Sequence, residues 1–417
     1  MPESATAPAL QFVLKVASRC NLNCTYCYVY NKGDTSWQMR PRLMSLETFA
    51  VALDRIENHC RASGQTEVRI TFHGGEPCLL GPDRFDQFCT LARRRLADRC
   101  AVLLSIQTNG TLINERWAEL LAKHDVSVGL SLDGPQTVND ALRVDFRGNG
   151  TYDDIIRGLS FLRGAGVAPQ ILCVIHFGAD GLDVHRHLVG LGARRINYLL
   201  PDFTHETAGS VFDTYGETPC ADYLLPVLDD WWYSGATDVR VSPFHDMARV
   251  ILGGETYIDV IGNRPYQYCF VETDGSIEGL DVLRVCGQGL SATGIRVQTE
   301  DFMAIAERSP LHRKIMFQGP SLPSTCRSCP ERETCGGGYL PHRFSALRGF
   351  DNSSVWCKDL LRLFGRLREH IRMSPQETAS RRAELIGAPA NWATASSSKT
   401  YPEQPLLLQR PELAPVK

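Results

Sequence analysis

The sequence predicts an α/β fold built on a parallel sheet, and three observations support this prediction. Short apolar runs alternate with helical stretches between residues 10 and 201. Most of these runs are nearly continuous in Val, Ile and Leu, as expected for strands that are covered on both faces. Polar or glycine-rich turns follow four consecutive runs. In parallel α/β folds such turns meet at the carboxyl ends of the strands, where ligands bind.

The expected strands span residues 12–16, 68–72, 102–106, 126–132, 171–175 and 196–200, and the expected helices span 45–61, 82–96, 115–123, 152–164 and 182–191. Ser45 is a favourable N-cap, and Glu47 places an acidic side chain in the first turn. Strands that alternate with helices form a parallel sheet with right-handed crossovers. A partial (β/α)6 barrel and an open doubly wound sheet both satisfy this pattern.

The bulk composition is that of a soluble globular protein. The chain has 417 residues, 43% of them hydrophobic and 22% charged, with a formal net charge of -3. This charge gives no support to a nucleic-acid or membrane-surface partner. The N-terminus lacks the basic and apolar regions of a signal peptide, and no apolar run approaches the roughly 18 residues that span a bilayer. We therefore expect a cytoplasmic protein of about two to three domains.

The 15 cysteines indicate metal ligation. Without a secretion signal a disulfide framework is not expected, so ligation is the better interpretation of the clustered cysteines. Several scattered ones fit the pattern of small buried hydrophobes instead, namely Cys60, Cys89, Cys100 and Cys173.

Cys20, Cys24 and Cys27 have a Cys-x3-Cys-x2-Cys spacing directly after the first expected strand. Three thiolates in so short a loop can hold three irons of a cubane cluster, which leaves the fourth iron open to an exchangeable ligand. A zinc site more often shows four ligands. The spacing therefore favours a 4Fe-4S cluster over zinc.

This loop, with Tyr26 between the second and third cysteines, resembles the cluster loop of the radical S-adenosylmethionine (SAM) enzymes. The resemblance favours the partial barrel and implies that the open iron binds SAM, with Tyr26 among the SAM-binding residues. An electron from an external donor such as flavodoxin or ferredoxin would then cleave SAM to a 5′-deoxyadenosyl radical. That radical would remove a hydrogen atom from substrate, while the protein supplies orientation and protection.

Gly74, Gly75 and Glu76 follow the second expected strand. Taken alone, the two glycines are equally consistent with a tight strand-to-helix turn and with close approach of a ligand to the backbone. In the radical SAM family a glycine-glycine-glutamate motif at this place binds the amino group of SAM. The resemblance therefore assigns these three residues to the ammonium group, with Glu76 as a charge-assisted acceptor.

Further SAM contacts are expected after the third and fourth strands. The segment with Ser131, Asp133 and Arg143 resembles the one that contacts SAM in peptide-modifying members. Arg143 would face the methionine carboxylate, because a guanidinium matches carboxylate geometry, although a surface arginine is the alternative. Ser131 and Asp133 would contact the carboxylate or the ribose. Asn109, before Gly110, fits a turn nearly as well as a ligand contact.

A second group of cysteines lies near the C-terminal end, in the order Cys326-x2-Cys329-x5-Cys335 and then Cys357. Four thiolates are enough for a complete cluster, and on composition alone zinc is a rival. The segment resembles the SPASM extension of radical SAM enzymes, which carries auxiliary iron–sulfur clusters.

The pattern departs from the SPASM motif at Tyr339, where that motif usually continues with a cysteine. We therefore expect one auxiliary cluster on Cys326, Cys329, Cys335 and Cys357. A second auxiliary cluster, on Cys269 and Cys286, stays open: it is absent, incomplete, or completed by a residue such as His342.

The expected domains are a lead over residues 1–9, the partial barrel over 10–201, a bridging region over 202–265, a SPASM or twitch-like auxiliary-cluster domain over 266–372, and a loose tail over 373–417 with a short helix near 379–385. Two runs, Gly-Leu-Asp-Val-Leu-Arg-Val-Cys-Gly-Gln-Gly at 279–289 and Cys-Gly-Gly-Gly-Tyr-Leu-Pro-His-Arg-Phe at 335–344, are similar to the cyclophane-forming peptide maturases of FxSxx-type gene clusters.

This resemblance predicts an enzyme that crosslinks side chains of a ribosomally made precursor peptide through carbon–carbon bonds. Asp274 and Glu272 are weak candidates for the base. The nearest enzymatic alternative is an anaerobic sulfatase-maturing type of enzyme, which oxidises a serine or cysteine of a protein substrate. A non-catalytic metal-binding module that recognises peptides is the alternative from another class.

Overall fold

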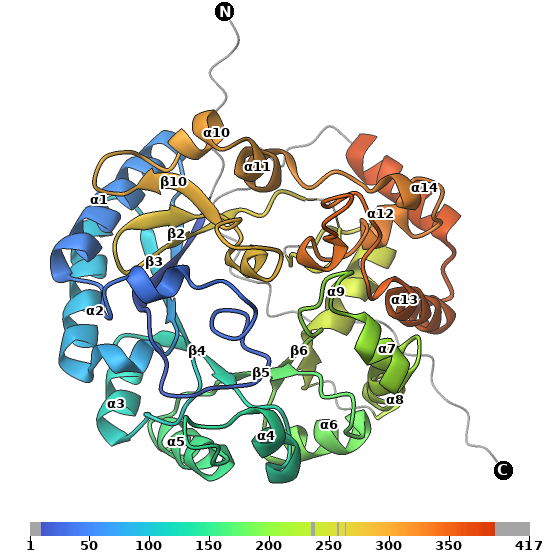
Figure 1. The fold of residues 1–417 in the computed structure, drawn as a ribbon, viewed down its shortest axis with the longest axis horizontal. Helices are drawn as coiled ribbons and strands as arrows, with labels where there is room; N and C mark the ends of the chain where they lie inside the picture. Colours follow the sequence, from blue (N-terminus) through green and yellow to red (C-terminus); the bar gives the residue numbers. More distant parts are fainter. Residues whose placement is uncertain (1–9, 235–237, 257, 263, 388–417) are drawn as a thin grey trace, which may run out of the picture.

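The computed structural model describes residues 10–234, 238–256, 258–262 and 264–387. The predicted lead over 1–9 and the predicted tail beyond 387 lie outside these residues. The centre of the fold is a ten-stranded sheet in the order β10-β9-β8-β1-β2-β3-β4-β5-β6-β7 (Figure 1). Its strands are β1 (Gln11–Ala17), β2 (Glu67–Gly74), β3 (Ala101–Thr108), β4 (Val126–Ser131), β5 (Gln170–Val174), β6 (Arg195–Leu199), β7 (Arg240–Val241), β8 (Tyr268–Val271), β9 (Ser276–Glu278) and β10 (Ala292–Arg296).

Strands β1 to β7 pair in parallel, and β8 pairs in parallel with β1. β8, β9 and β10 are antiparallel to one another. The sheet curves into an arc whose two edges, β7 and β10, do not pair with each other. The partial barrel is therefore confirmed over the open doubly wound sheet. Because β8 continues the sheet from β1, the cysteine-rich C-terminal segment is joined to the barrel through backbone hydrogen bonds.

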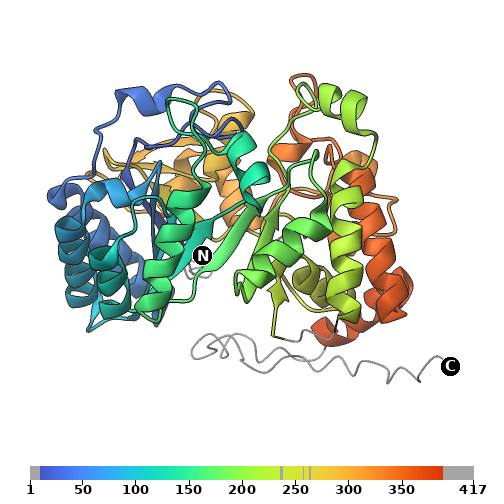
Figure 2. The same ribbon diagram turned by 90° about the horizontal axis from the view of Figure 1, so that it is seen from below.

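Helices line the outside of the arc (Figures 1 and 2). They are α1 (Leu46–Ser63), α2 (Pro82–Leu96), α3 (Glu115–Lys123), α4 (Gln136–Leu142), α5 (Tyr152–Gly164), α6 (Gly181–Gly190), α7 (Gly209–Tyr215), α8 (Pro219–Tyr233), α9 (Ser242–Ile251), α10 (Ala304–Arg308), α11 (Pro310–Arg313), α12 (Arg332–Cys335), α13 (Cys357–Ile371) and α14 (Pro375–Gly387). No helix among the described residues is both long and apolar enough to span a membrane.

The helix N-cap that the sequence predicted is present in the structure. The side chain of Ser45 caps α1 by accepting a 3.0 Å hydrogen bond from Thr48 N, and Gly64 ends the helix in the left-handed conformation. Helices α2, α3 and α5 have the predicted bounds. Helix α4 was not predicted, and the short helix expected near 379–385 is the longer α14.

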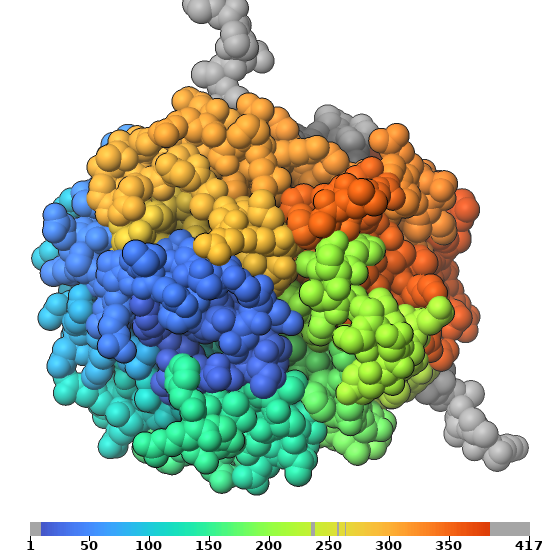
Figure 3. Space-filling model, in the orientation of Figure 1, coloured from blue at the N-terminus to red at the C-terminus, as the bar shows by residue number. Residues whose placement is uncertain are grey.

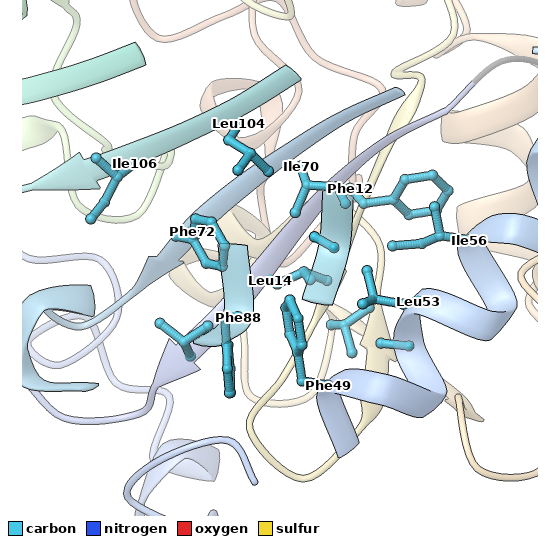
Figure 4. Close-up of a cluster of buried hydrophobic side chains, with 14 of the residues drawn as sticks. Phe12, Leu14, Phe49, Leu53, Ile56, Ile70, Phe72, Phe88, Leu104 and Ile106 are labelled. Atoms are coloured by element: carbon cyan, nitrogen blue, oxygen red, sulfur yellow. The ribbon is translucent and has the colours of Figure 1, made fainter. Parts of the chain in front are cut away.

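One face of the barrel strands packs against the helices and forms the main core (Figure 4). Phe12 and Phe72 point to this side, and Phe49 of α1 stacks on Phe88 of α2 with ring centroids 4.0 Å apart. Burying each of these rings stabilises the fold by about 1.5–3 kcal/mol. The other strand face is less buried, so burial alternates along β2 and β4. The expectation of strands covered on both faces is therefore wrong for these strands, because their second face lines the inside of the barrel.

Trp356 fastens the C-terminal segment to the barrel. It is fully buried, its Nε1 donates a 3.1 Å hydrogen bond to Pro201 O, and its ring packs against Phe177, Phe203 and Phe212. The aromatic patch predicted at 228–233 lies on α8, where Trp232 stacks on His370 of α13. Trp232 is thus a packing residue, as the sequence indicated.

Candidate cluster and cofactor site

The loop with Cys20, Cys24 and Cys27 follows β1 and crosses the mouth of the barrel, at the front of Figures 1 and 3. All three thiols are free and partly buried, and Cys24 lies close enough to raise the pKa of both Cys20 and Cys27. Burial raises the pKa of Cys20 to about 12. Two donors nevertheless point at its Sγ, Leu22 N at 3.4 Å and Asn109 Nδ2 at 3.7 Å. Three such thiols, with donors aimed at sulfur, fit a cationic iron cluster.

Gly74 and Gly75 bring the end of β2 against this loop. A Cβ on Gly74 would lie 2.1 Å from Ala17 O, and one on Gly75 would lie 2.0 Å from the Tyr30 hydroxyl. Gly75 N donates a 2.9 Å hydrogen bond to Ala17 O, which closes the contact. The glycine pair is therefore needed for close approach of two backbone segments, whether or not a ligand also lies there.

Glu76 is fully buried, and its carboxylate accepts three hydrogen bonds from the protein. Oε1 accepts from Cys78 N at 2.9 Å and from the Thr108 hydroxyl at 2.7 Å, and Oε2 accepts from Asn109 N at 2.8 Å. The carboxylate thus joins the ends of β2 and β3, because a buried carboxylate requires donors on its oxygens. Its oxygens have about four lone-pair sites, so Oε2 can accept one more bond, and the contact with an ammonium group stays a prediction.

Tyr26, Asp133 and Arg143 form one connected group. The Tyr26 hydroxyl donates a 2.6 Å hydrogen bond to Asp133 Oδ2 and accepts a 2.6 Å bond from Arg143 Nη1. Asp133 Oδ1 accepts from Val174 N at 2.9 Å. Arg143 follows α4, and its buried Nε has no hydrogen-bond partner among the described residues. An unsatisfied guanidinium nitrogen at the barrel mouth fits an anionic ligand group such as a carboxylate.

Ser131 and Asn109 line the same rim. Ser131 Oγ accepts a 3.0 Å hydrogen bond from Gln107 Nε2, and Gly129 makes room for Gln107, whose Oε1 would be 2.1 Å from a Cβ there. Asn109 Oδ1 accepts from Thr111 N at 3.0 Å, which is a turn contact. Asn109 therefore has the turn role, its Nδ2 also faces Cys20, and its contact with SAM stays a prediction.

A layer of charged groups inside the barrel was missed at the sequence level. Lys15 Nζ lies 2.9 Å from Asp281 Oδ2 and 3.0 Å from Glu272 Oε1, and the Tyr28 hydroxyl donates a 2.7 Å hydrogen bond to Asp281. His73 on β2 is paired in register with Lys15 on β1. The two-residue period of these strands, with Phe72 and Leu14 facing outward, is the signal that could have placed Lys15 and His73 inside.

Glu272 and Asp274, the two residues suggested as the base, lie in different environments. Glu272 is buried, and its Oε1 pairs with Lys15 at 3.0 Å, with Arg40 at 2.9 Å and with Arg284 at 2.8 Å. Asp274 lies at the turn between β8 and β9, where its Oδ1 accepts from Ser276 N at 2.9 Å. The role of either carboxylate as the base stays a prediction.

The four C-terminal cysteines converge. Cys326, Cys329, Cys335 and Cys357 together line a small cavity beside α12 and the start of α13. All four are free thiols, and Cys326 interacts electrostatically with both Cys335 and Cys357. Burial raises the pKa of Cys335 to about 12, so a cation is required to hold it as a thiolate. The donor set fits an auxiliary iron–sulfur cluster.

Cys269 and Cys286 lie in different apolar clusters. Cys269 is paired in register with Phe12, and its side chain lies in the main core on the helix side of the sheet. Cys286 lies in a different apolar cluster together with Tyr339, and its Sγ faces Pro341 O at 3.7 Å. A second auxiliary cluster held by these two cysteines stays a prediction, which the position of Cys269 on the helix side of β8 does not favour.

Phenols and a carboxylate fill the interior beside Cys286 instead. The hydroxyls of Tyr268 and Tyr339 hydrogen-bond to Asp259, while His342 packs against the Tyr339 ring with centroids 5.1 Å apart. His342 lies 3.4 Å from Asp202 and is almost fully buried. It packs between the rings of Tyr339 and Trp356.

Comparisons with known proteins agree with this geometry. Residues 14–187 match the family model described as the radical SAM superfamily. A cysteine-type anaerobic sulfatase-maturating enzyme of Clostridium perfringens is 26% identical over 366 residues, which cover 86% of this chain and 96% of its own. A serine-type anaerobic sulfatase-maturating enzyme of Bacteroides thetaiotaomicron is 23% identical over 398 residues, covering 90% of this chain and 93% of its own.

Solved structures share the fold. The native enzyme anSMEcpe with bound AdoMet and the Kp18Cys peptide superposes with a TM-score of 0.73 at 22% identity, covering 91% of this chain and 99% of its own. SuiB of Streptococcus suis bound to its precursor peptide SuiA has a TM-score of 0.52 at 17% identity, covering 84% and 76%.

Proposed function

The chain is a radical SAM enzyme that uses a 4Fe-4S cluster and SAM, and we propose that it oxidises a serine or cysteine side chain of a protein or peptide substrate. The observation that supports this most is the extent of similarity to the cysteine-type sulfatase-maturating enzyme. It covers 96% of that enzyme, so it includes the cysteine-rich segment as well as the barrel.

Cys20, Cys24 and Cys27 would hold the SAM-cleaving cluster. When bound, the cluster and SAM supply a radical that removes one hydrogen atom from the substrate. Arg143 would bind the SAM carboxylate through the side of the guanidinium that lacks a protein partner. Tyr26 would hold Arg143 and Asp133 in place, and Gly74, Gly75 and Glu76 would bind the ammonium group.

Cys326, Cys329, Cys335 and Cys357 would hold one auxiliary cluster. The cysteines line one cavity in the segment that shares its sheet with the barrel. A one-electron acceptor is needed because hydrogen-atom removal leaves a carbon radical, whose conversion to an aldehyde releases one more electron and one proton. The external reductant for SAM cleavage would be a flavodoxin or ferredoxin.

The proposal is tested by incubating the iron-loaded enzyme anaerobically with SAM, dithionite and peptides that contain a single serine or cysteine. A serine peptide should lose two hydrogen atoms and then react with a hydrazide probe, because the product is an aldehyde. A cysteine peptide should lose sulfur and gain oxygen with the same reactivity. Cys20→Ala should abolish 5′-deoxyadenosine formation, whereas Cys60→Ala, at a buried packing position, should retain it. Peptides that stay unmodified while SAM is cleaved would contradict the proposal.

Carbon–carbon crosslinking of a precursor peptide is the second candidate. It is favoured by Tyr339, which replaces the usual cysteine within a run that is similar to cyclophane-forming maturases, and which hydrogen-bonds to Asp259. A crosslinked peptide would also lose two hydrogen atoms per link. It would not react with the hydrazide probe, and tandem mass spectrometry would give no fragments between the joined residues.

A further inference from the structure

We propose that Met39, Phe146 and Leu347 form an apolar rim that binds the substrate polypeptide around the side chain to be oxidised. This role rests on the proposed oxidation of a serine or cysteine, and it adds the class of substrate, a segment with large apolar side chains next to the target residue. Among the described residues these three are the most exposed large apolar side chains, at 90%, 70% and 92% of full exposure.

Phe146 lies at the tip of a turn beside the cluster loop. The turn is closed by a 2.9 Å hydrogen bond from Asp145 N to Asn149 O. It is joined to the cluster loop because Asn23 N, between the first two cysteines of that loop, donates a 2.8 Å hydrogen bond to Val144 O. The Phe146 ring is therefore held outward next to the proposed cluster.

Met39 ends the short helical turn Ser36–Met39, which also lies against the cluster loop. Arg19 directly precedes the first cysteine of that loop, and its guanidinium donates to Trp37 O at 2.7 Å and to Gln38 O at 3.0 Å. These bonds fix the turn, so the Met39 side chain is presented to solvent beside the start of the loop.

Leu347 lies at the tip of a turn of the C-terminal segment. Ser345 and Gly349 close this turn with two backbone hydrogen bonds of 2.8 Å. The turn is joined to the barrel because His205 N, in the segment that follows β6, donates a 3.0 Å hydrogen bond to Phe344 O. Leu347 thus lies beside the carboxyl end of a barrel strand, as the cluster loop does.

The three turns come from distant parts of the sequence but lie around the mouth of the barrel. Figure 2 shows them along its upper edge, with residues 36–39 in blue, 145–149 in green and 345–349 in orange. A substrate side chain that approaches the cluster loop from solvent therefore passes beside them. A single exposed apolar residue needs no explanation, but three that surround the entrance to one site indicate an interaction surface.

The exposure of these side chains favours an apolar partner. Each turn is fixed by hydrogen bonds, so its apolar side chain could turn inward only if those bonds broke. Contact with an apolar side chain of the substrate removes both surfaces from water, which favours binding. Because the residue to be oxidised must enter the mouth, the residues on either side of it are the ones that contact the rim.

The test measures binding of dye-labelled peptides to the iron-loaded enzyme with SAM and without reductant, by fluorescence anisotropy. One peptide has leucines on both sides of a single serine, and the other has glutamines there. The wild-type enzyme should bind the leucine peptide about tenfold or more tightly than the glutamine peptide. The triple variant Met39→Ser, Phe146→Ser, Leu347→Ser should bind both peptides equally, with unchanged iron content and melting temperature.

Tyr233→Ser is the matched control. Tyr233 is also exposed, at 60%, but it ends α8 beside the start of β7, at the opposite end of the strands from the mouth. This variant loses an exposed aromatic ring as Phe146→Ser does, and it should keep the wild-type preference for leucine.

A wild-type enzyme without this preference, or a triple variant that keeps it, would overturn the proposal. A flavodoxin is the other partner that could cover the rim, so SAM cleavage driven by flavodoxin is measured as well. A loss of that activity in the triple variant, with unchanged peptide binding, would assign the rim to the electron donor and would also overturn the proposal. Because binding is measured without reductant, failure of serine or cysteine oxidation leaves the rim-dependent affinity intact. Failure of the rim instead leaves an oxidised peptide that the variant and the wild type bind equally.

Discussion

The hydroxyl group of Tyr26 donates a 2.6 Å hydrogen bond to Asp133 Oδ2 and accepts one of 2.6 Å from Arg143 Nη1. These bonds join the cysteine loop to the end of β4 and to the residue that follows α4. The phenol thus orients a carboxylate and a guanidinium that are both buried. The geometry of the proposed SAM site therefore depends on a residue of the cluster loop itself.

Tyr26→Phe should weaken SAM binding by about tenfold or more, because hydrogen bonds to charged groups contribute about 1.5–3 kcal/mol each. The aromatic ring remains, so iron content should stay near that of the wild type. Equilibrium dialysis of SAM against the cluster-loaded protein measures the dissociation constant. Tyr215→Phe, at the exposed end of α7, is the control and should bind SAM normally. Equal affinities for the Tyr26 and Tyr215 variants would rule out the orienting role.

Gly75→Ala should disrupt the cluster loop. Its Cβ would lie 2.0 Å from the Tyr30 hydroxyl and 2.3 Å from Arg19 O, so the loop and the strand end must move apart. We expect a lower melting temperature and loss of the iron held by the loop. Gly365→Ala on α13 is matched in chemistry but has open space around its Cβ, and should be neutral or stabilise by about 0.5–1 kcal/mol. Normal iron content in Gly75→Ala would contradict the contact.

The bounds of the barrel's strands and helices could be predicted closely, because each element is indicated by residues that are neighbours in the sequence. The strands and helices of residues 10–201 alternate in the sequence, and α2, α3 and α5 have the expected bounds. The position of Cys269 in the main core could not be predicted, because sequence spacing does not tell which face of β8 its side chain takes. Likewise the three donors that bond to the Glu76 carboxylate could not be predicted, because they come from backbone and side-chain groups that meet only in the folded chain.

The number of iron atoms bound per chain should distinguish a protein with two clusters from one with three. The wild-type protein should bind about eight iron atoms per chain, four for each of two cubane clusters. Cys335→Ala should lose about four of them, because one ligand in the cavity of four cysteines is removed. Cys269→Ala should keep the wild-type iron content, since its thiol lies in the core. A value near twelve, falling by four in Cys269→Ala, would show that an additional cluster exists at that residue.

The buried ion pairs of Glu278 should stabilise the protein at neutral pH. Burial opposes its ionisation, but Lys15, Arg284 and Arg40 outweigh this effect and lower its pKa to about 2. Because the folded pKa is below the unfolded value of 4.5, the stabilisation is present above about pH 4.5 and is lost as pH falls toward 2. Glu278→Gln should cost about 3 kcal/mol at pH 7 and show a weaker loss of stability on acidification.

Urea unfolding of the protein at pH 7 and at pH 4 checks this pH dependence. Glu57→Gln is the control, because Glu57 forms an exposed pair with Arg61 at 2.7 Å within α1. Such a pair contributes less than about 0.5 kcal/mol, so the control should follow the wild-type curve. A Glu278 variant as stable as the control at pH 7 would mean that the ion pairs give no net stabilisation.

The proposed oxidation is tested most directly by tracing the hydrogen atom that is removed from Cβ of the substrate serine or cysteine. The iron-loaded enzyme is incubated with SAM, a reductant and a peptide whose single serine or cysteine carries deuterium at Cβ. Oxidation of that side chain predicts deuterium in the 5′-deoxyadenosine, together with a hydrazide-reactive peptide that has lost deuterium from the same carbon. Unlabelled 5′-deoxyadenosine beside a peptide that keeps all its deuterium would contradict the claim.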